Sequence, residues 1–193
     1  RQMCIRDRLY IDKKSIADVD VIHHNLFTNQ IAYLMLPFDC KKVPDELLPY
    51  VGLLSSVLGL MDTHKHTYPE LTNEININSG GIATDAAIYT DSKDFSKYTV
   101  MYEVKGKVLY EKLPFVLEMM HEIIYETKFE DEKRLREIIA RIKSRMESNM
   151  TGSGHTVAML SAMAQFSPSS YYSDILRGYQ SVSYTHLRAH ETR

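Results

Sequence analysis

The stretch GGIATDAAIYTDSKDFSKYTVMYEVKG (Gly80–Gly106) decides the fold of this chain. It contains two segments rich in β-branched and aromatic residues, Ile82–Asp91 and Lys97–Gly106, on either side of the linker SKDFS. Every second residue from Tyr98 to Val104 is a tyrosine or a valine, which is the period of a strand with one buried face. Because the linker is short and polar, we expect the two strands to form an antiparallel hairpin.

Gly80 and Gly81 raise the question of a phosphate site, since glycine-rich turns often bind phosphate. Such loops run from a strand through the glycines into a helix, whose N-terminal amides face the anion. Here a short helix predicted over Tyr68–Asn78 precedes the glycines, and the carbonyl end of a helix repels phosphate. The sequence contains neither GxxxxGKS/T nor GxGxxG. We interpret the glycines as a helix stop and a turn into a strand; a functional variant of this interpretation has the strand border a substrate cavity.

Two further elements are predicted before this hairpin. The apolar run Ile31–Leu36, which Pro37 ends, has the length of a strand rather than of a helix. The segment Pro44–Met61 has an acidic start and apolar residues at helical spacing almost all round, so we expect a central helix. Gly52 and Gly59 within it indicate close packing against a neighbour.

The second half of the chain is predicted to be helical. We expect helices over about Lys112–Thr127 and Asp131–Asn149, then two short helices, one near Ser153 and one starting at Pro168. Strands and helices do not alternate strictly along the chain, which argues against a doubly wound parallel sheet. The sequence therefore predicts an α+β fold, in which helices pack on one face of an antiparallel sheet.

The composition is that of an ordinary globular domain and argues against several functional classes. The 193 residues are 44% hydrophobic and 25% charged, and the net charge of −2 gives no sign of a nucleic-acid partner. Cys4 and Cys40 lie far apart without a CxxC pair, so neither a disulfide framework nor a thiolate zinc site is indicated. No apolar run approaches the ~18 residues of a membrane span, and no secretory signal opens the chain. We expect a cytoplasmic protein with no membrane partner.

Two motifs resemble parts of a metal site. HEIIYE (His121–Glu126) invites comparison with HExxH, but a tyrosine holds the second ligand position. Glu126 lies five residues after the histidine and is expected to point elsewhere. His64 and His66 could coordinate a metal together with Glu70, but no further ligand is evident. We interpret the two motifs as an ordinary amphipathic helix and a solvated loop.

Other polar candidates have structural interpretations. His23 and His24 precede the first predicted strand, and adjacent residues in a strand point to opposite faces, so we assign them no role. Ser153 is a candidate N-cap that places His155 in a first helical turn, as a general base or as a capping or packing residue. Asp174 is distant in sequence, so no Ser/His/Asp arrangement can be argued.

The basic residues of Lys133–Arg145 are interleaved with and flanked by acidic residues. This pattern predicts a solvated helix face rather than a nucleic-acid patch. From motifs alone, the sequence predicts no complete catalytic, cofactor-binding or metal site.

The two ends of the chain, RQMCIRDR (Arg1–Arg8) and VSYTHLRAHETR (Val182–Arg193), resemble translated sequencing-adapter sequence. No helical or strand period is sustained around the charged residues of the second of these. We expect both ends to be artefacts, with residues 9–181 as an internal segment of a longer reading frame. The alternative is a genuine, poorly ordered tail.

Residues 9–181 as a whole resemble part of a known family. The segment HHNLFTNQIAYLMLPFDCKKVPDELLPYVGLLSSVLGLMDTHKHTYPELTNEININSGGI (His23–Ile82) is similar to the second half of the insulinase- or pitrilysin-type zinc metallopeptidases, in their presequence-protease branch. So is YEVKGKVLYEKLPFVLEMMHEIIYETKFEDEKRLREIIARIKSRMESNMTGSGHTVAMLSAMAQFSPSSYYSDILRGY (Tyr102–Tyr179). The order of motifs is kept throughout the segment.

The resemblance implies an arrangement of four related α+β domains that close around peptides, with catalytic zinc on an HxxEH motif of the first. This chain is similar to the third domain and extends toward the start of the next. LPYVGLLSSVLGLM (Leu48–Met61) takes the place of the HxxEH helix without a histidine or a glutamate, and NSGGIATDAAIYTD (Asn78–Asp91) takes that of an HGG turn and its strand. LRGY (Leu176–Tyr179) does not match the arginine–GGAYG motif. The resemblance thus implies a metallohydrolase-like domain with no catalytic, cofactor-binding or metal residue of its own.

These implications predict an internal noncatalytic fragment of a zinc-dependent metalloendopeptidase, whose Zn²⁺ is bound outside the fragment. The fragment is expected to be inactive alone and to contribute wall and scaffold to a closed chamber. Its partners are then peptide substrates and the other domains of the longer chain. The alternative is a noncatalytic processing or assembly subunit of the same superfamily, and an unrelated binding module requires an accidental resemblance. A domain cut from a clamshell is also expected to expose apolar surface and to self-associate.

Overall fold

The computed structural model describes residues 11–94 and 96–177. The chain divides into two compact units, residues 1–31 and 32–193. The expectations for Arg1–Arg8 and Val182–Arg193 lie outside the described residues and stay predictions, as do the boundaries of the domain over residues 9–181.

The first unit contains a β-hairpin that the sequence pattern did not predict. β1 (Asp12–Ile16) pairs antiparallel with β2 (Val19–His23). Ala17 and Asp18 form the turn with φ values of 50° and 63°, the left-handed conformation at both turn positions. Asn-Gly or Asp-Gly usually marks such turns, and neither pair occurs here. His23 lies within β2, so its expected place before the first strand is wrong.

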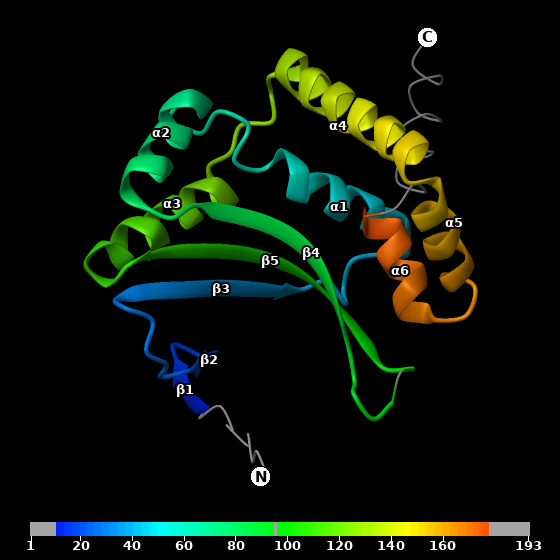
Figure 1. Ribbon diagram of the computed structural model, residues 1–193. Helices are drawn as coiled ribbons and strands as arrows, with labels where there is room; N and C mark the ends of the chain where they lie inside the picture. Colours follow the sequence, from blue (N-terminus) through cyan, green and yellow to red (C-terminus); the bar gives the residue numbers. More distant parts are fainter. Residues whose placement is uncertain (1–10, 95, 178–193) are drawn as a thin grey trace, which may run out of the picture. The chain divides into compact units, whose positions relative to one another are not determined.

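The second unit contains a sheet in which β5 (Tyr98–Leu109) lies between β3 (Ile31–Asp39) and β4 (Ile82–Thr90). β4 and β5 pair antiparallel, with Ala86 opposite Tyr102, which confirms the predicted hairpin. Figure 1 shows β3 on the other side of β5.

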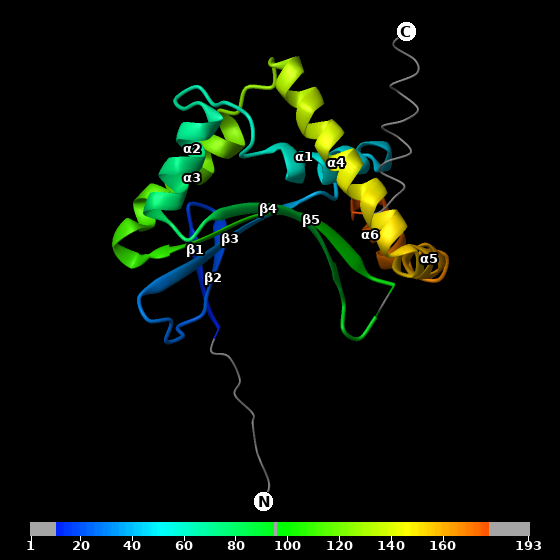
Figure 2. The same cartoon turned by 45° about the horizontal axis from the view of Figure 1, so that its top comes forward.

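The six α-helices of the described residues lie over one face of this sheet, and Figure 2 shows the strands arched beneath them (Figures 1 and 2). They are α1 (Leu48–Val57), α2 (Tyr68–Asn78), α3 (Leu113–Tyr125), α4 (Glu132–Gly152), α5 (Gly154–Met163) and α6 (Pro168–Arg177). The predicted α+β class, with helices on one face of an antiparallel sheet, is confirmed.

The main core forms between β5 and the helix layer. Val100, Tyr102, Val104 and Val108 are buried and share one face, because side chains alternate along a strand. Burying such a side chain contributes about 1.5–3 kcal/mol. The same cluster contains Leu48 of α1, Val116 and Met120 of α3, and Ile175 and Leu176 of α6. One face of β5 therefore holds three helices in place.

Two elements end at places that differ from the prediction. β3 continues through Pro37, because it lies at the edge of the sheet, where a missing N–H need not break the ladder. The helix predicted over Pro44–Met61 ends at Val57, and Gly59 follows with a φ of +81°. A Cβ at Gly59 would meet nothing within 4 Å, so its predicted packing role is wrong and its role is the left-handed turn.

Gly52 fixes how α1 crosses α6. A Cβ added at Gly52 would lie 2.0 Å from the backbone oxygen of Leu176, which is far inside van der Waals contact. Only glycine lets the two backbones approach this closely. The predicted close packing at Gly52 is confirmed.

We predict that Gly52→Ala lowers the free energy of unfolding by about 1–3 kcal/mol, because the added methyl group meets backbone rather than a side chain that can rotate away. Urea unfolding followed by circular dichroism measures the change. Gly152→Ala is the matched control, since Gly152 also lies in a helix but a Cβ there meets nothing within 4 Å. We expect the control to be neutral or slightly stabilising. Equal unfolding midpoints for wild type and Gly52→Ala contradict the described helix crossing.

Candidate functional site

The segment Leu48–Met61 occupies the place where the family resemblance puts a zinc-binding helix. It contains no His, Cys, Asp or Glu. Leu48, Val57 and Met61 are buried in apolar clusters. Zinc sites in proteins are built from imidazole, thiolate and carboxylate ligands. The residues present therefore do not fit a metal, and the segment serves as core.

The two histidine motifs of the sequence meet in the structure. The loop before α2, which carries HKH, lies along the end of α3, which carries HEIIYE. Thr63 forms a β-bridge with Thr127, and the backbone N–H of His64 donates to the carbonyl of Glu126 at 3.1 Å. Thr63 and Glu122 are hydrogen-bonded although 59 residues separate them in sequence, so no local pattern predicts the contact.

The centre of this junction is the buried carboxylate of Glu122. Its Oε1 accepts a hydrogen bond from the Thr63 hydroxyl and lies 2.9 Å from Nδ1 of His66. The Glu122 side chain is fully buried, whereas that of His66 is 31% exposed. Burial raises the pKa of Glu122, but the bonds from Thr63 and His66 and the charge of Lys65 bring it below its ordinary value. An ionised carboxylate thus fastens the loop to α3.

A second carboxylate of the same junction, that of Glu126, lies near two basic side chains. Oε1 of Glu126 lies 3.0 Å from Nζ of Lys65 and 3.7 Å from Nδ1 of His121. The expectation that Glu126 points away from His121 is therefore wrong. The solvated-loop interpretation of HKH is also wrong for His66, because its ring contacts Glu122. Within residues 11–94 and 96–177, no group of three or more His, Cys, Asp or Glu side chains could hold a metal ion.

The remaining polar candidates lie in ordinary structural places. Ser153 is the N-cap residue of α5, but its side chain makes no capping hydrogen bond. His155 is exposed at the start of α5, and Asp174 is buried in α6. These positions supply no geometry for a general base.

Gly80 and Gly81 form the predicted turn from a helix into a strand. The prediction of a solvated basic face on α4 is confirmed only in part. Gly81 has a φ of +111°, and the N–H of Gly80 donates to the carbonyl of Lys107 at 2.8 Å, so the pair ends α2 and leads into β4. Arg134 of α4 is not merely solvated: its guanidinium carbon lies 3.9 Å from the centroid of the Tyr68 ring. This cation–π contact ties the start of α4 to the start of α2.

The face of the sheet opposite the helices carries a charged network that the sequence analysis did not identify. Nζ of Lys105 lies 2.5 Å from Oε2 of Glu103 and 4.0 Å from Oδ2 of Asp85. The hydroxyl of Tyr89 donates to Glu103, and this bond together with burial raises the pKa of Tyr89. The available signal is the alternation of β5, which puts Glu103 and Lys105 on the face that Tyr102 and Val104 do not share.

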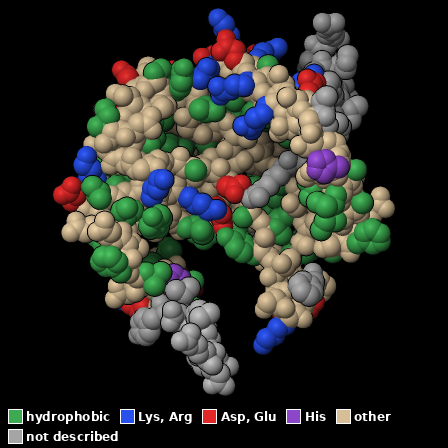
Figure 3. All heavy atoms as spheres, in the orientation of Figure 1, with side chains coloured by type: hydrophobic (Ala, Val, Ile, Leu, Met, Phe, Trp, Pro, Cys, Tyr) green, Lys and Arg blue, Asp and Glu red, His purple; other side chains and the backbone are tan. Residues whose placement is uncertain are grey.

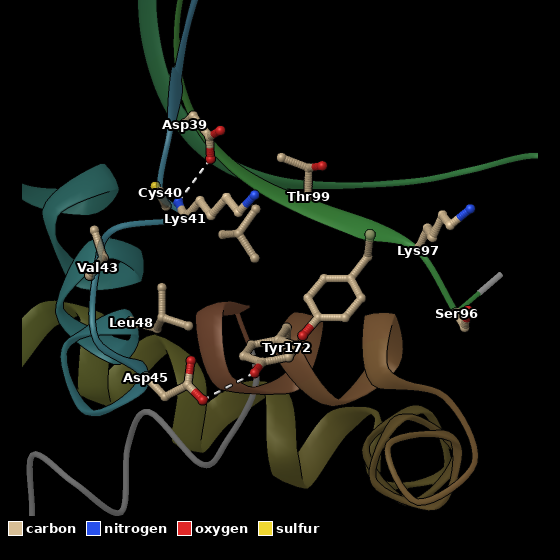
Figure 4. Close-up of a pocket in the computed structure, with 12 residues that line it drawn as sticks. Asp39, Cys40, Lys41, Val43, Asp45, Leu48, Ser96, Lys97, Thr99 and Tyr172 are labelled. Carbon is tan, nitrogen blue, oxygen red and sulfur yellow. Dashed lines mark hydrogen bonds between the residues drawn. The ribbon is translucent and has the colours of Figure 1, made fainter. Parts of the chain in front are cut away.

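A pocket of about 480 Å³ lies between the connection from β3 to α1, the start of β5, and α6 (Figure 4). The hydroxyl of Tyr172 donates to Oδ2 of Asp45 at 3.1 Å, and the ring centroids of Tyr98 and Tyr172 are 4.9 Å apart. Figure 4 shows Tyr172 among the lining residues, with the side chain of Lys97 directed away from it.

The pocket lining contains no activated nucleophile among its described residues. Burial raises the pKa of the Cys40 thiol, and a neutral thiol is a poor nucleophile. The hydrogen bond with Tyr98, burial and the neighbouring Asp45 raise the pKa of Tyr172. Its hydroxyl therefore stays protonated at neutral pH and acts as a hydrogen-bond donor. Among the described lining residues, neither the Cys40 thiol nor the Tyr172 hydroxyl is therefore activated as a nucleophile.

We predict that Glu122→Gln lowers the free energy of unfolding at pH 7 by about 1–3 kcal/mol, because it removes the charge that Thr63 and His66 hold in a buried place. Since the native pKa of Glu122 is lowered, its stabilisation is present above the unfolded-state pKa and is lost as the pH falls through the native pKa. Wild type should therefore lose more stability than the variant between about pH 5 and pH 3. Urea unfolding at a series of pH values measures both effects.

Glu118→Gln is the control for this experiment, because it removes an exposed carboxylate from the same helix. We expect its unfolding curves to follow those of wild type at each pH. If the free energy of unfolding of Glu122→Gln also changes with pH as that of wild type does between about pH 5 and pH 3, Glu122 is not an ionised carboxylate that stabilises this junction.

None of the described helices combines the length and the apolar character that crossing a membrane requires.

Comparison with known proteins identifies relatives over most of the chain. Residues 5–186 match the family described as associated with peptidase family M16, subfamily C. Protein HypA of Clostridium perfringens is 32% identical over 167 residues, which are 86% of this chain and 17% of that protein. Presequence protease 1, chloroplastic/mitochondrial, of Arabidopsis thaliana is 28% identical over 174 residues, 89% of this chain and 16% of that protein.

The mitochondrial presequence protease of Candida albicans is 29% identical over 170 residues, which are 85% of this chain and 16% of that protein. The chain thus spans less than a fifth of the length of these curated relatives. The chain belongs to this peptidase-associated family, in the presequence-protease-like branch of the insulinase-type peptidases.

Proposed function

We propose that this chain is an internal, noncatalytic domain of a zinc-dependent metalloendopeptidase that degrades peptides in a closed chamber. The matching relatives include presequence proteases that extend far beyond the matched region. Residues 9–181 correspond in this proposal to the third domain and run toward the start of the fourth. The longer protein is then the enzyme, and this segment alone cleaves nothing.

The observation that carries the proposal is the apolar segment Leu48–Met61. A helix that binds zinc in an HxxEH arrangement needs two histidines one turn apart and a glutamate beside them. At this place the chain has leucines, valines and a methionine that pack in clusters with the sheet and α4. The zinc of the longer protein is therefore proposed to bind outside this segment.

The sheet supports a wall and scaffold role. Its helix-bearing face is closed by core packing, whereas the opposite face carries the partly exposed Asp85 and Lys105 and the exposed Tyr33 and Met35 of β3. We propose that this second face is turned toward the chamber. A polar wall with scattered apolar side chains suits unfolded peptides, which present both backbone polar groups and apolar side chains.

A second candidate function is a noncatalytic processing or assembly subunit of the same superfamily. The degenerate metal helix fits this function equally well, so the two differ in whether the longer chain keeps an intact HxxEH motif elsewhere. Family membership excludes the third possibility, an unrelated binding module.

The location of the protein stays a prediction. The sequence favours a cytoplasmic protein, whereas several relatives are named as mitochondrial or chloroplastic proteins. We propose the cytoplasmic location for this chain, and a fluorescent fusion of the longer protein in its source cell tests it.

We predict that the purified chain carries far less than one zinc per molecule and does not hydrolyse a quenched fluorescent peptide. The physical reason is the absence of nitrogen or carboxylate ligands in Leu48–Met61. Elemental analysis after dialysis measures the metal, and fluorescence with and without a chelator measures the cleavage. A preparation with the substitution Glu122→Gln controls for adventitious metal at the His66 junction. Stoichiometric zinc with chelator-sensitive cleavage by the wild-type chain contradicts the proposal.

A further inference from the structure

α5 leaves apolar side chains in solvent. The helix GHTVAMLSAM has no charged residue and no buried residue. Met159, Leu160 and Met163 are 55%, 40% and 47% exposed, and Phe166 in the turn after the helix is 87% exposed. Figure 3 shows hydrophobic side chains gathered where α5 lies in Figure 1.

Met159 and Met163 lie one turn apart and so share one side of the helix. The exposed Phe166 follows three residues after the end of the helix. The exposed Ala158 and Ala162 lie beside the two methionines and let a neighbouring backbone approach closely. We call these five residues the α5 stripe.

The neighbouring helix α4 has an exposed face that is charged and solvated. α4 carries Arg136 and Glu132 with side chains 82% and 80% exposed, as an i, i+4 ion pair. Lys143 and Glu147 repeat this pattern two turns further on. Exposed apolar side chains also occur elsewhere, such as Ile77 of α2, but on α5 several lie close together on a helix without lysine, arginine, aspartate or glutamate, which is the pattern that marks an interaction surface.

The side chains of the α5 stripe indicate which kind of partner surface would fit it. It offers no lysine or arginine for phosphates, and helices that lie on membranes carry such residues on their polar face. It offers no charge for an ion pair, so a complementary surface is apolar. Methionines adapt their shape and suit a packed protein interface.

We propose that the α5 stripe docks onto an apolar surface of another domain of the longer protein. This inference rests on the proposed function, in which the chain is one domain of a larger enzyme. The relatives contain enough further sequence for such a partner domain, because this chain covers only 16–17% of their length. Docking at α5 also places the contact next to α6, from which the chain continues at Arg177.

The test compares one pair of substitutions in two contexts. Met159→Glu/Met163→Glu is made in this 193-residue chain and in the longer protein recovered from the source DNA. In the short chain both positions are exposed, so we expect an unchanged unfolding midpoint. In the longer protein we expect a clearly lower midpoint, because two carboxylates are then forced into an apolar interface. Ile77→Glu is the matched control, since Ile77 is 65% exposed on α2, away from the stripe.

Methionine oxidation by dilute hydrogen peroxide, followed by mass spectrometry, gives a second readout that needs no substitution. We expect Met159 and Met163 to oxidise at least about fivefold more slowly in the longer protein than in the short chain. Met120, which is fully buried, should be protected in both.

Each outcome decides the proposal. Loss of stability and protection only in the longer protein supports docking. Equal exposure in both contexts overturns it, and so does a loss of stability in both, which makes the stripe part of this chain's own core. Self-association of the short chain through α5, without any effect in the longer protein, assigns the stripe to a second copy and also overturns it. Because none of these readouts is peptide hydrolysis, the inference can fail while the proposed function stands.

Discussion

The structure depends on the alternation of side chains along β5. On one face its valines and Tyr102 form the core against α1, α3 and α6. Gly106 continues this face and lets α3 close in, since a Cβ there would meet Met120 at 2.5 Å and Val116 at 3.0 Å. On the other face, Glu103 and Lys105 form a charged network. A shift of one residue in register would exchange the two faces and put Glu103 and Lys105 against the helices in place of the apolar core residues.

The groups that most resemble catalytic chemistry hold the scaffold together. Glu122, His66 and Thr63 combine a carboxylate, an imidazole and a hydroxyl, as many hydrolytic sites do. Here they join a loop to the end of α3. A buried carboxylate with two bonded neighbours rigidifies its surroundings whether or not it does chemistry. Residue type alone therefore does not distinguish a catalytic site from a structural hydrogen-bond network. The contacts around the residues are needed for that distinction.

Local patterns in the sequence predict most of the elements but few of the contacts between them. The hairpin of β4 and β5 and the helix α2 follow from alternation and glycine stops. The hairpin of β1 and β2 does not, because its turn is made by Ala17 and Asp18 rather than by glycine or asparagine. The junction at Glu122 joins segments far apart in the chain, so periodicity carries no information about it. That Leu48–Met61 contains no His, Cys, Asp or Glu, in contrast, can be read directly from the sequence.

The central claim is that this chain is one noncatalytic domain of a longer zinc peptidase. The most direct measurement is to sequence the source DNA outward, past Arg1–Arg8 and Val182–Arg193. The account predicts that the reading frame continues, with an HxxEH motif upstream and an arginine–GGAYG motif downstream. If instead both end segments are genomic and a true stop follows, the chain is a free-standing relative, and the peptidase function must be withdrawn from it.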